Sequence, residues 1–490
     1  MSDTPYNNEN SPFAEPAGRV SACDADRPVS ALKEFMSSLQ IPIISSLRRL
    51  DSAPRKFLFF TASNVVSWQC LVGPTLVLFA RKLDMPASWV GMLISFMPLS
   101  MLLVILTLPL VTWFGPKTIM ARGWLLRNLI SSLAFAVPLA MYWWGPRAGW
   151  YVLGLSTLGF CVMRAIGSGD WFPWLHEVVP EDQRATFFST ETGIAQLVNV
   201  LVLLLQGLIL QGDPPVWRFL IIYGIGIFAG LISIRWMMQV PGGEGAREMF
   251  SLRTSFGSYK IALKDGPFMR FITLASMGFS IVAWITASNV LYMRDALGYS
   301  SQYILVITAT GSLFVLLTIG AWGRYTDHSG SGHSMSLTMI GHTCAATSLL
   351  LLWPGAPWTN WCMPLVVPTT TLFAAAFLMA AHRAMLNYVQ ETGRVGYTNL
   401  WIVGTSLALG VTPILAGQLI DRWHLRGFEA CFMISAGAGL ICAVLSAWIV
   451  RDHPQGEYPD LRLFNPVEPW RTLARIVWVT VGLHPSNRQG

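Results

Sequence analysis

The feature that most constrains this chain is a series of long apolar segments, each about as long as a bilayer is thick. A helix needs roughly 20 mostly apolar residues to cross about 30 Å of hydrocarbon. Only 12% of the residues are charged, whereas soluble domains carry about 25%. Twelve apolar windows of this length occur, at residues 57–80, 88–113, 120–144, 149–169, 186–211, 216–238, 268–292, 302–322, 334–353, 361–382, 396–419 and 427–450.

Helices are the expected structure of these windows. Lipid offers no hydrogen-bond partner to backbone N–H and C=O groups, so a spanning segment is either a helix or a strand of a closed barrel. The windows lack the alternation of apolar and polar residues that membrane barrel strands show. We therefore predict an all-α integral membrane protein with twelve transmembrane helices.

The distribution of Lys and Arg predicts the orientation, because these residues accumulate on the cytoplasmic side of membrane proteins. With both termini in the cytoplasm, 26 of the 33 basic residues lie on that side and 7 on the other. We expect a multi-pass protein of the cytoplasmic (inner) membrane with both termini cytoplasmic. The net charge of +7 then reflects topology, and we expect a lipid bilayer but no nucleic acid as partner.

An internal repeat divides the chain into two halves. The segment VPEDQR, which ends at Arg184, aligns with VQETGR, which ends at Arg394, and each follows the fourth window of its half. The longest polar stretch between windows separates the halves. The predicted parts are a disordered then amphipathic cytoplasmic tail (1–56), a first six-helix bundle (57–239), a central cytoplasmic loop (240–267), a second six-helix bundle (268–450) and a tail with an interfacial or docking helix (451–490).

Two pseudo-symmetric bundles of six helices with a polar central loop resemble the major facilitator superfamily. Its members carry a loop motif of the form Gly-x-x-x-Asp-Arg/Lys-x-Gly between the second and third helices, sometimes repeated between the eighth and ninth. The second-half copy, GRYTDHSGSG, has Gly323, Asp327 and Gly330 in register. The first-half copy keeps Gly115 and Lys117 but lacks the Asp.

The resemblance implies transport by alternating access, in which the two halves pivot about one central site. It also implies that the motif Asp pairs with an Arg at the cytoplasmic face, so we expect Asp327 to pair with Arg383 or Arg394. Simple solvation of these loop charges is the alternative. The predicted cytoplasmic gate comprises Asp327, Arg383, Arg394, Arg184, Gly323 and Gly330.

Two ionisable residues fall inside predicted spans, where charge is costly and usually has a structural or functional role. Arg164 lies in the fourth window and Glu191 in the fifth. Both lie about eight residues from the turn between these windows, so we expect an ion pair. One interpretation is a structural salt bridge; the other is that Glu191 takes up a proton or that Arg164 holds an anionic substrate group.

Further polar and aromatic residues are candidates for the wall of a central cavity. Glu191, Asn199 and Gln206 share one side of the fifth window. Hydrogen bonding between helices and aromatic packing are the alternative roles. The predicted substrate or coupling residues are Trp68, Gln69, Arg164, Glu191, Gln196, Asn199, Gln206, Trp284 and Asn289.

Several motifs are absent from the sequence. No P-loop, G-x-S-x-G or HExxH pattern occurs, which disfavours nucleotide-driven transport and hydrolysis. The cysteines lack paired metal-ligand spacing. We expect neither an enzyme nor a cofactor nor a metal.

We therefore predict a monomeric secondary active transporter of a small solute, with uptake coupled to protons or Na⁺ favoured over export. The alternative is a non-transporting membrane protein of the same fold that acts as an assembly factor or receptor. The degenerate first-half motif favours that alternative, whereas the intramembrane polar residues favour transport.

Overall fold

Long helices make up most of the described chain. The computed structural model describes residues 50–104, 114–168, 174–175, 178–180, 184–243, 252–390, 392–451, 476–477 and 480, all in one unit that begins at Leu50. The first half contains α3 (Ser52–Val72), α4 (Pro74–Lys82), α5 (Ala87–Ser100), η1 (Met101–Leu103), α7 (Pro116–Ser131), η2 (Ser132–Ala136), α8 (Val137–Trp144), α9 (Pro146–Ser168), α11 (Arg184–Ile209) and α12 (Val216–Met238). The second half contains α13 (Leu252–Lys264), α14 (Gly266–Leu291), η4 (Tyr292–Ala296), α15 (Ser301–Ser329), α16 (Ser331–Leu350), α17 (Thr359–Tyr388), α18 (Arg394–Trp423) and α19 (Leu425–Ile449).

Within the described residues, ten helical stretches are long and apolar enough to cross a membrane. Two predicted spans are not among them. One is a shorter apolar helix over Ala87–Leu103, and the rest of its window, 105–113, lies outside the described residues. The other is α16, which is rich in Ser, Thr and His and is buried over most of its length. With these two, the helices match the twelve predicted spans.

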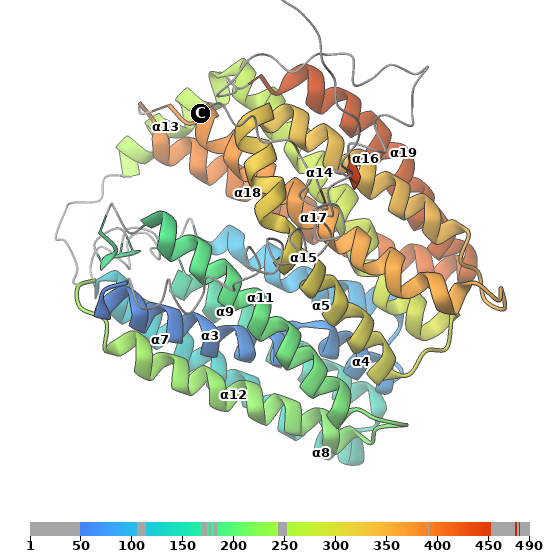
Figure 1. The fold of residues 1–490 in the computed structure, drawn as a ribbon. Helices are drawn as coiled ribbons and strands as arrows, with labels where there is room; N and C mark the ends of the chain where they lie inside the picture. Colours follow the sequence, from blue (N-terminus) through green and yellow to red (C-terminus); the bar gives the residue numbers. More distant parts are fainter. Residues whose placement is uncertain are drawn as a thin grey trace, which may run out of the picture. The chain divides into compact units, whose positions relative to one another are not determined.

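Each half is held together by packing between helices distant in sequence (Figure 1). In the first half α3 packs against α11 and α12, and α7 packs against α9 and α12. In the second half α16 packs against α17 and α19, while α14 packs against α18 and α19. Two further pairs, α5 with α18 and α11 with α15, join the halves.

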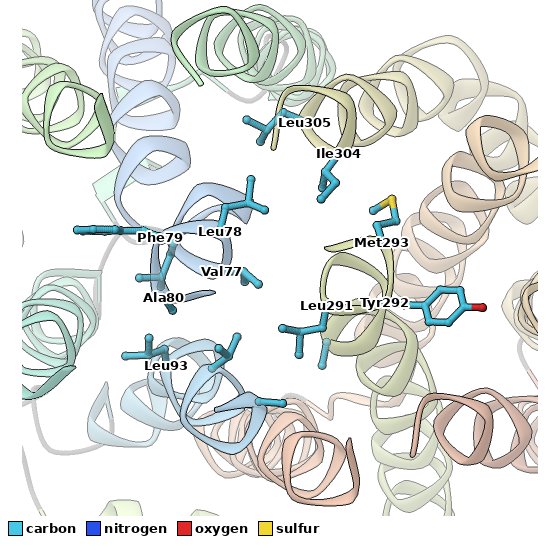
Figure 2. Packing of buried hydrophobic residues seen from close by; sticks show 14 of the residues in the cluster. Val77, Leu78, Phe79, Ala80, Leu93, Leu291, Tyr292, Met293, Ile304 and Leu305 are labelled. Carbon is cyan, nitrogen blue, oxygen red and sulfur yellow. The ribbon is translucent and has the colours of Figure 1, made fainter. Parts of the chain in front are cut away.

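One end of the helices closes the space between the halves. This closed end carries the turns at 83–86, 297–300 and 424. Its apolar cluster draws residues from both halves, including Val77 and Leu78 from the first and Leu291, Met293 and Ile304 from the second, as Figure 2 shows. Separating the halves at this end would expose this apolar surface to water, at a cost of about 25 cal/mol per Å².

At the opposite end of the helices, the main apolar cluster is not shared between the halves. The cluster that contains Phe271, Phe377 and Trp401 draws all its members from α13 to α19 and the residue that follows α19. Among the described residues this cluster does not extend into the first half. The halves are therefore joined by a shared apolar core at the closed end but not by this second cluster.

The predicted central loop contains a helix. α13 lies within 240–267 and packs against α18. Asn399 donates a hydrogen bond from Nδ2 to the Tyr259 hydroxyl at 2.6 Å, and Asp265 caps α14 by accepting from the Phe268 N–H at 3.1 Å. The predicted amphipathic tail segment 31–50 lies outside the described residues except Leu50. In the C-terminal tail, Ile476 is buried in a cluster with Trp322.

The glycines of the two motif copies share one backbone conformation. Gly115, before α7, has φ 81° and ψ 148°, and Gly330, between α15 and α16, has φ 83° and ψ 156°. This region of backbone space is essentially restricted to glycine. The glycine of the motif is therefore required by the turn in both halves, including the half that lacks the motif Asp.

Replacement of Gly330 by Ala should lower the free energy of unfolding by about 1–3 kcal/mol, because a Cβ is strained in this conformation. Gly115→Ala should do the same. Gly320→Ala is the matched control, because Gly320 is helical and has open space around it, so Ala should be neutral or stabilising. Thermal unfolding in detergent measures this. Equal stability of Gly330→Ala and Gly320→Ala would show that the turn does not require glycine at position 330.

Candidate functional site

The three residues of the predicted polar side of α11, Glu191, Asn199 and Gln206, lie in different environments. Gln206 is buried. Its Oε1 accepts a hydrogen bond from Thr75 Oγ1 at 2.7 Å, and its Nε2 donates to the Gln69 carbonyl and to Cys70 Sγ, both at 3.3 Å. This amide therefore ties α11 to α3 and α4 within the first half. The Gln69 side chain is also buried, so neither residue lines an accessible cavity.

The expected ion pair between Arg164 and Glu191 does not form, and that prediction is wrong. Glu191 Oε1 instead accepts a hydrogen bond from Thr61 Oγ1 of α3 at 3.0 Å. Arg164 Nη1 lies 3.8 Å from Met101 Sδ, a weak acceptor. Both charged side chains are half-buried. The structure thus places two ionisable groups in the first half without joining them to each other.

Asn199 lies at the contact between the two halves. Its Nδ2 donates to Ser312 Oγ of α15 at 3.5 Å, while its Oδ1 is buried and has no hydrogen-bond partner in the described structure. Gln196, one turn earlier on α11, is half-buried. These two residues remain cavity candidates at the interface between the halves.

The remaining candidates lie within single halves. Trp68 donates from Nε1 to Met97 Sδ at 3.2 Å. Asn289 is buried and donates from Nδ2 to Thr370 Oγ1 at 3.3 Å. Trp284 packs against the apolar cluster of the closed end. Packing therefore accounts for Trp284. Helix-to-helix hydrogen bonding accounts for Asn289 only in part, because its Oδ1 is buried without a hydrogen-bond partner in the described structure.

Arg127 of α7 is a buried charge that the sequence analysis did not select. Its side chain is 0% exposed. Its Nη2 donates to Asn64 Oδ1 at 2.6 Å, and its guanidinium lies over the rings of Trp124 and Phe160, 4.3 and 4.9 Å from their centroids. The sequence contained the information needed to find it, because Arg127 is a charged residue inside the third apolar window, just as Arg164 is inside the fourth.

The predicted pair at the motif forms as expected. Arg383 Nε lies 3.0 Å from Asp327 Oδ1, and Arg383 Nη1 donates to Ser331 Oγ at 2.9 Å. Arg383 of α17 thereby links the end of α15 to the start of α16. Arg394 is exposed at the start of α18, and the side chain of Arg184 lies outside the described residues.

Polar contacts between the halves gather at the closed end. The Asp421 carboxylate of α18 accepts from the backbone N–H groups of Ala87 and Ser88, both at 2.8 Å, so it caps the first turn of α5. Arg81 of α4 pairs with Asp295 at 3.0 Å. A carboxylate at a helix N-terminus satisfies otherwise unpaired N–H groups and complements the helix dipole.

Glycine allows α5 and α18 to come close. A Cβ on Gly417 of α18 would overlap the backbone of Ala87 and Ser88, and a Cβ on Gly91 of α5 would overlap the carbonyl of Pro413. Small residues of this kind bring transmembrane helices into direct backbone contact. The closed end is therefore held by apolar packing, an ion pair, a helix cap and close backbone contact.

Comparison with known proteins identifies a family. A family model described as Major Facilitator Superfamily matches residues 171–371 and 369–483. A search of curated proteins gives no match.

Solved transporters share the fold. A D-xylose–proton symporter has a TM-score of 0.64 at 13% identity, covering 83% of this chain and 99% of its own. The nucleoside transporter NupG has 0.58 at 14% identity, covering 81% and 98%. A bacterial homologue of the iron transporter ferroportin, in its inward-facing state, has 0.62 at 14% identity, covering 82% and 99%. At these identities the likeness concerns the fold alone.

Asp421→Asn should open the closed end, because hydrogen bonds to a charged group contribute about 1.5–3 kcal/mol each. We expect the ratio of closed to open molecules to fall about tenfold or more. Pulsed EPR distances between spin labels at Gln211 and Leu351, one in each half, measure this ratio. Asp213→Asn is the control, because Asp213 pairs with Lys82 within the first half. An unchanged distance distribution in Asp421→Asn would refute the role of the cap.

Gln206→Leu should reduce stability by about 1–2 kcal/mol, the range for hydrogen bonds between membrane helices. Solute affinity should stay at the wild-type value, since the amide faces protein rather than a cavity. Thermal unfolding and ligand binding on the same preparation separate the two effects. A stable variant with lost affinity would return Gln206 to the list of cavity residues.

Proposed function

This chain belongs to the major facilitator superfamily, and we propose that it is a secondary active transporter that moves a small solute by alternating access. The observation that supports this most directly is the contrast between the two ends of the helices. At the closed end, apolar and polar contacts join the halves, whereas the cluster around Phe271, Phe377 and Trp401 at the other end draws its described members from the second half. This arrangement fits one state of a rocking mechanism.

The positive-inside rule supports the orientation that we propose for this state. The six connections at the closed end of the helices (83–86, 145, 210–215, 297–300, 351–358 and 424) are flanked by 7 of the 33 basic residues, so we assign this end to the non-cytoplasmic side of the inner membrane. Both termini then lie in the cytoplasm. The structure corresponds to a state that is closed to the outside.

Glu191 is the group that we propose for proton coupling. It is half-buried in a span, and Thr61 is its hydrogen-bond donor. No described Lys or Arg lies within ion-pair distance of it. A carboxylate inside a membrane without a cationic partner is costly, so protonation in one state and release in the other fits this site. The alternative is that transport is coupled to Na⁺ instead of protons.

Proton flux into proteoliposomes tests the coupling. Wild-type protein should show substrate-dependent proton movement with at least one pool of sugars, organic acids, amino acids or peptides. Glu191→Gln should abolish this movement, because an amide takes up no proton at neutral pH. Glu429→Gln serves as control, since Glu429 is exposed on α19.

Each other outcome has a definite meaning. Proton flux retained in folded Glu191→Gln would remove Glu191 from the coupling path. Solute uptake that follows a Na⁺ gradient would replace the proton by Na⁺. No movement of any pool would count against transport, and a pull-down of membrane partners would then test the assembly-factor alternative, which the degenerate first-half motif favours.

A further inference from the structure

The interior of the first half contains two arginines without an acidic partner among the described residues. Arg127 of α7 is 0% exposed. It uses Nη2 to donate to Asn64, while its Nε and Nη1 are buried without a hydrogen-bond partner. The rings of Trp124 and Phe160 flank the guanidinium. Cation–π contacts offset part of the cost of burying this charge, but they leave two donors unsatisfied.

Arg164 of α9 is the more accessible member of the pair. It is half-buried, and Met101 Sδ is the acceptor that the described structure provides for it. The Arg127 guanidinium lies over the ring of Phe160, which is one helical turn before Arg164 on α9, so the two arginines belong to the same α7–α9 contact. Two like charges in a medium of low dielectric destabilise one another unless an anion compensates them.

The described carboxylates do not serve as partners of these two arginines. Glu191, the nearest of them along the chain to this region of α9, hydrogen-bonds to Thr61. No described carboxylate forms a hydrogen bond or an ion pair with Arg127 or Arg164. Other described acids also have partners elsewhere: Asp213 pairs with Lys82, Asp295 with Arg81 and Asp327 with Arg383, while Asp265 caps α14 and Asp421 caps α5.

We propose that Arg164 contacts the anionic group, carboxylate or phosphate, of the transported solute and that Arg127 attracts this group from its buried position on α7. The guanidinium of Arg164 presents paired donors that match the two oxygens of either group. Arg127 acts as a positioning residue, because its buried donors do not reach a solute. This assignment rests on the proposed transport function and names its substrate class.

The fixed position of the Arg127 guanidinium explains how it could act on a bound anion. Its aromatic and Asn64 contacts hold the guanidinium in place, so its field acts on an anion bound at Arg164 without a conformational change. A positive potential in a site of low dielectric favours anions over uncharged solutes of the same size. The two arginines therefore provide selectivity by charge.

Ligand-induced thermal stabilisation of the purified full-length protein tests this assignment. The anionic probes are succinate, citrate, glucose 6-phosphate and inorganic phosphate, and the uncharged probes are glucose and uridine. We expect at least one anion to stabilise the wild type. Arg164→Gln should weaken its binding by about tenfold or more, since a charge-assisted hydrogen bond is lost, and Arg164→Lys should restore part of it. Arg122→Gln, an exposed Arg of the same α7, is the control and should bind like wild type.

The role of Arg127 has its own readout. Methyl phosphate, a dianion at pH 8, and methyl sulfate, a monoanion of the same shape, are compared as probes. Arg127→Gln should reduce the preference for the dianion, because one positive charge is lost. A purely structural role would weaken the binding of both probes by the same factor. If Arg127→Gln does not fold, Arg127→Lys should fold and keep the preference.

The outcomes separate this assignment from the proposed function. Uptake of an uncharged solute into proteoliposomes, with no anion bound or with anion binding unchanged in Arg164→Gln, would overturn the anion site and leave transport standing. Anion binding that depends on Arg164 without movement of any solute would support the site and count against transport. If no anion in the panel stabilises the wild type, the assignment is wrong.

Discussion

The hydrocarbon core of a bilayer contains no water, and most of this structure follows from that. Backbone N–H and C=O groups must pair within the protein, so the spanning segments are helices. Polar side chains face the same requirement. Gln206 meets it through Thr75, Gln69 and Cys70, while Arg127 meets it only in part, through Asn64 and two aromatic rings. Arg127 is one of several described residues whose requirement is incompletely met, and we interpret it functionally.

Most contacts between the halves lie at one end of the helices. The halves are therefore held together at that end. Asp421 binds the first turn of α5 across the interface, and Gly417 and Gly91 let α5 and α18 meet at backbone distance. Such contacts depend on geometry and are lost together when the helices move apart. Two rigid halves joined in this way favour a small number of discrete states over continuous deformation.

The sequence motif indicated one turn conformation and one ion pair that the structure contains. The motif glycine Gly330 and its first-half counterpart Gly115 adopt one conformation, and Asp327 pairs with Arg383 near the same turn. The Arg164–Glu191 pair was wrong, because counting residues from a turn gives depth in the membrane but not the rotation of each helix about its axis. Arg127 was missed although it lies seven residues inside its apolar window, so the criterion that selected Arg164 applied to it as well.

The sequence by itself determined the class of protein, the twelve spans and the repeat, since these depend on segment length, apolar content and turn chemistry. Only the tertiary structure decided which polar residues meet. Side chains such as Glu191, Thr61, Arg127 and Asn64 are brought together by helices far apart in the chain. Their partners depend on how each helix is rotated in its bundle, and that rotation is set by the packing of all its neighbours at once.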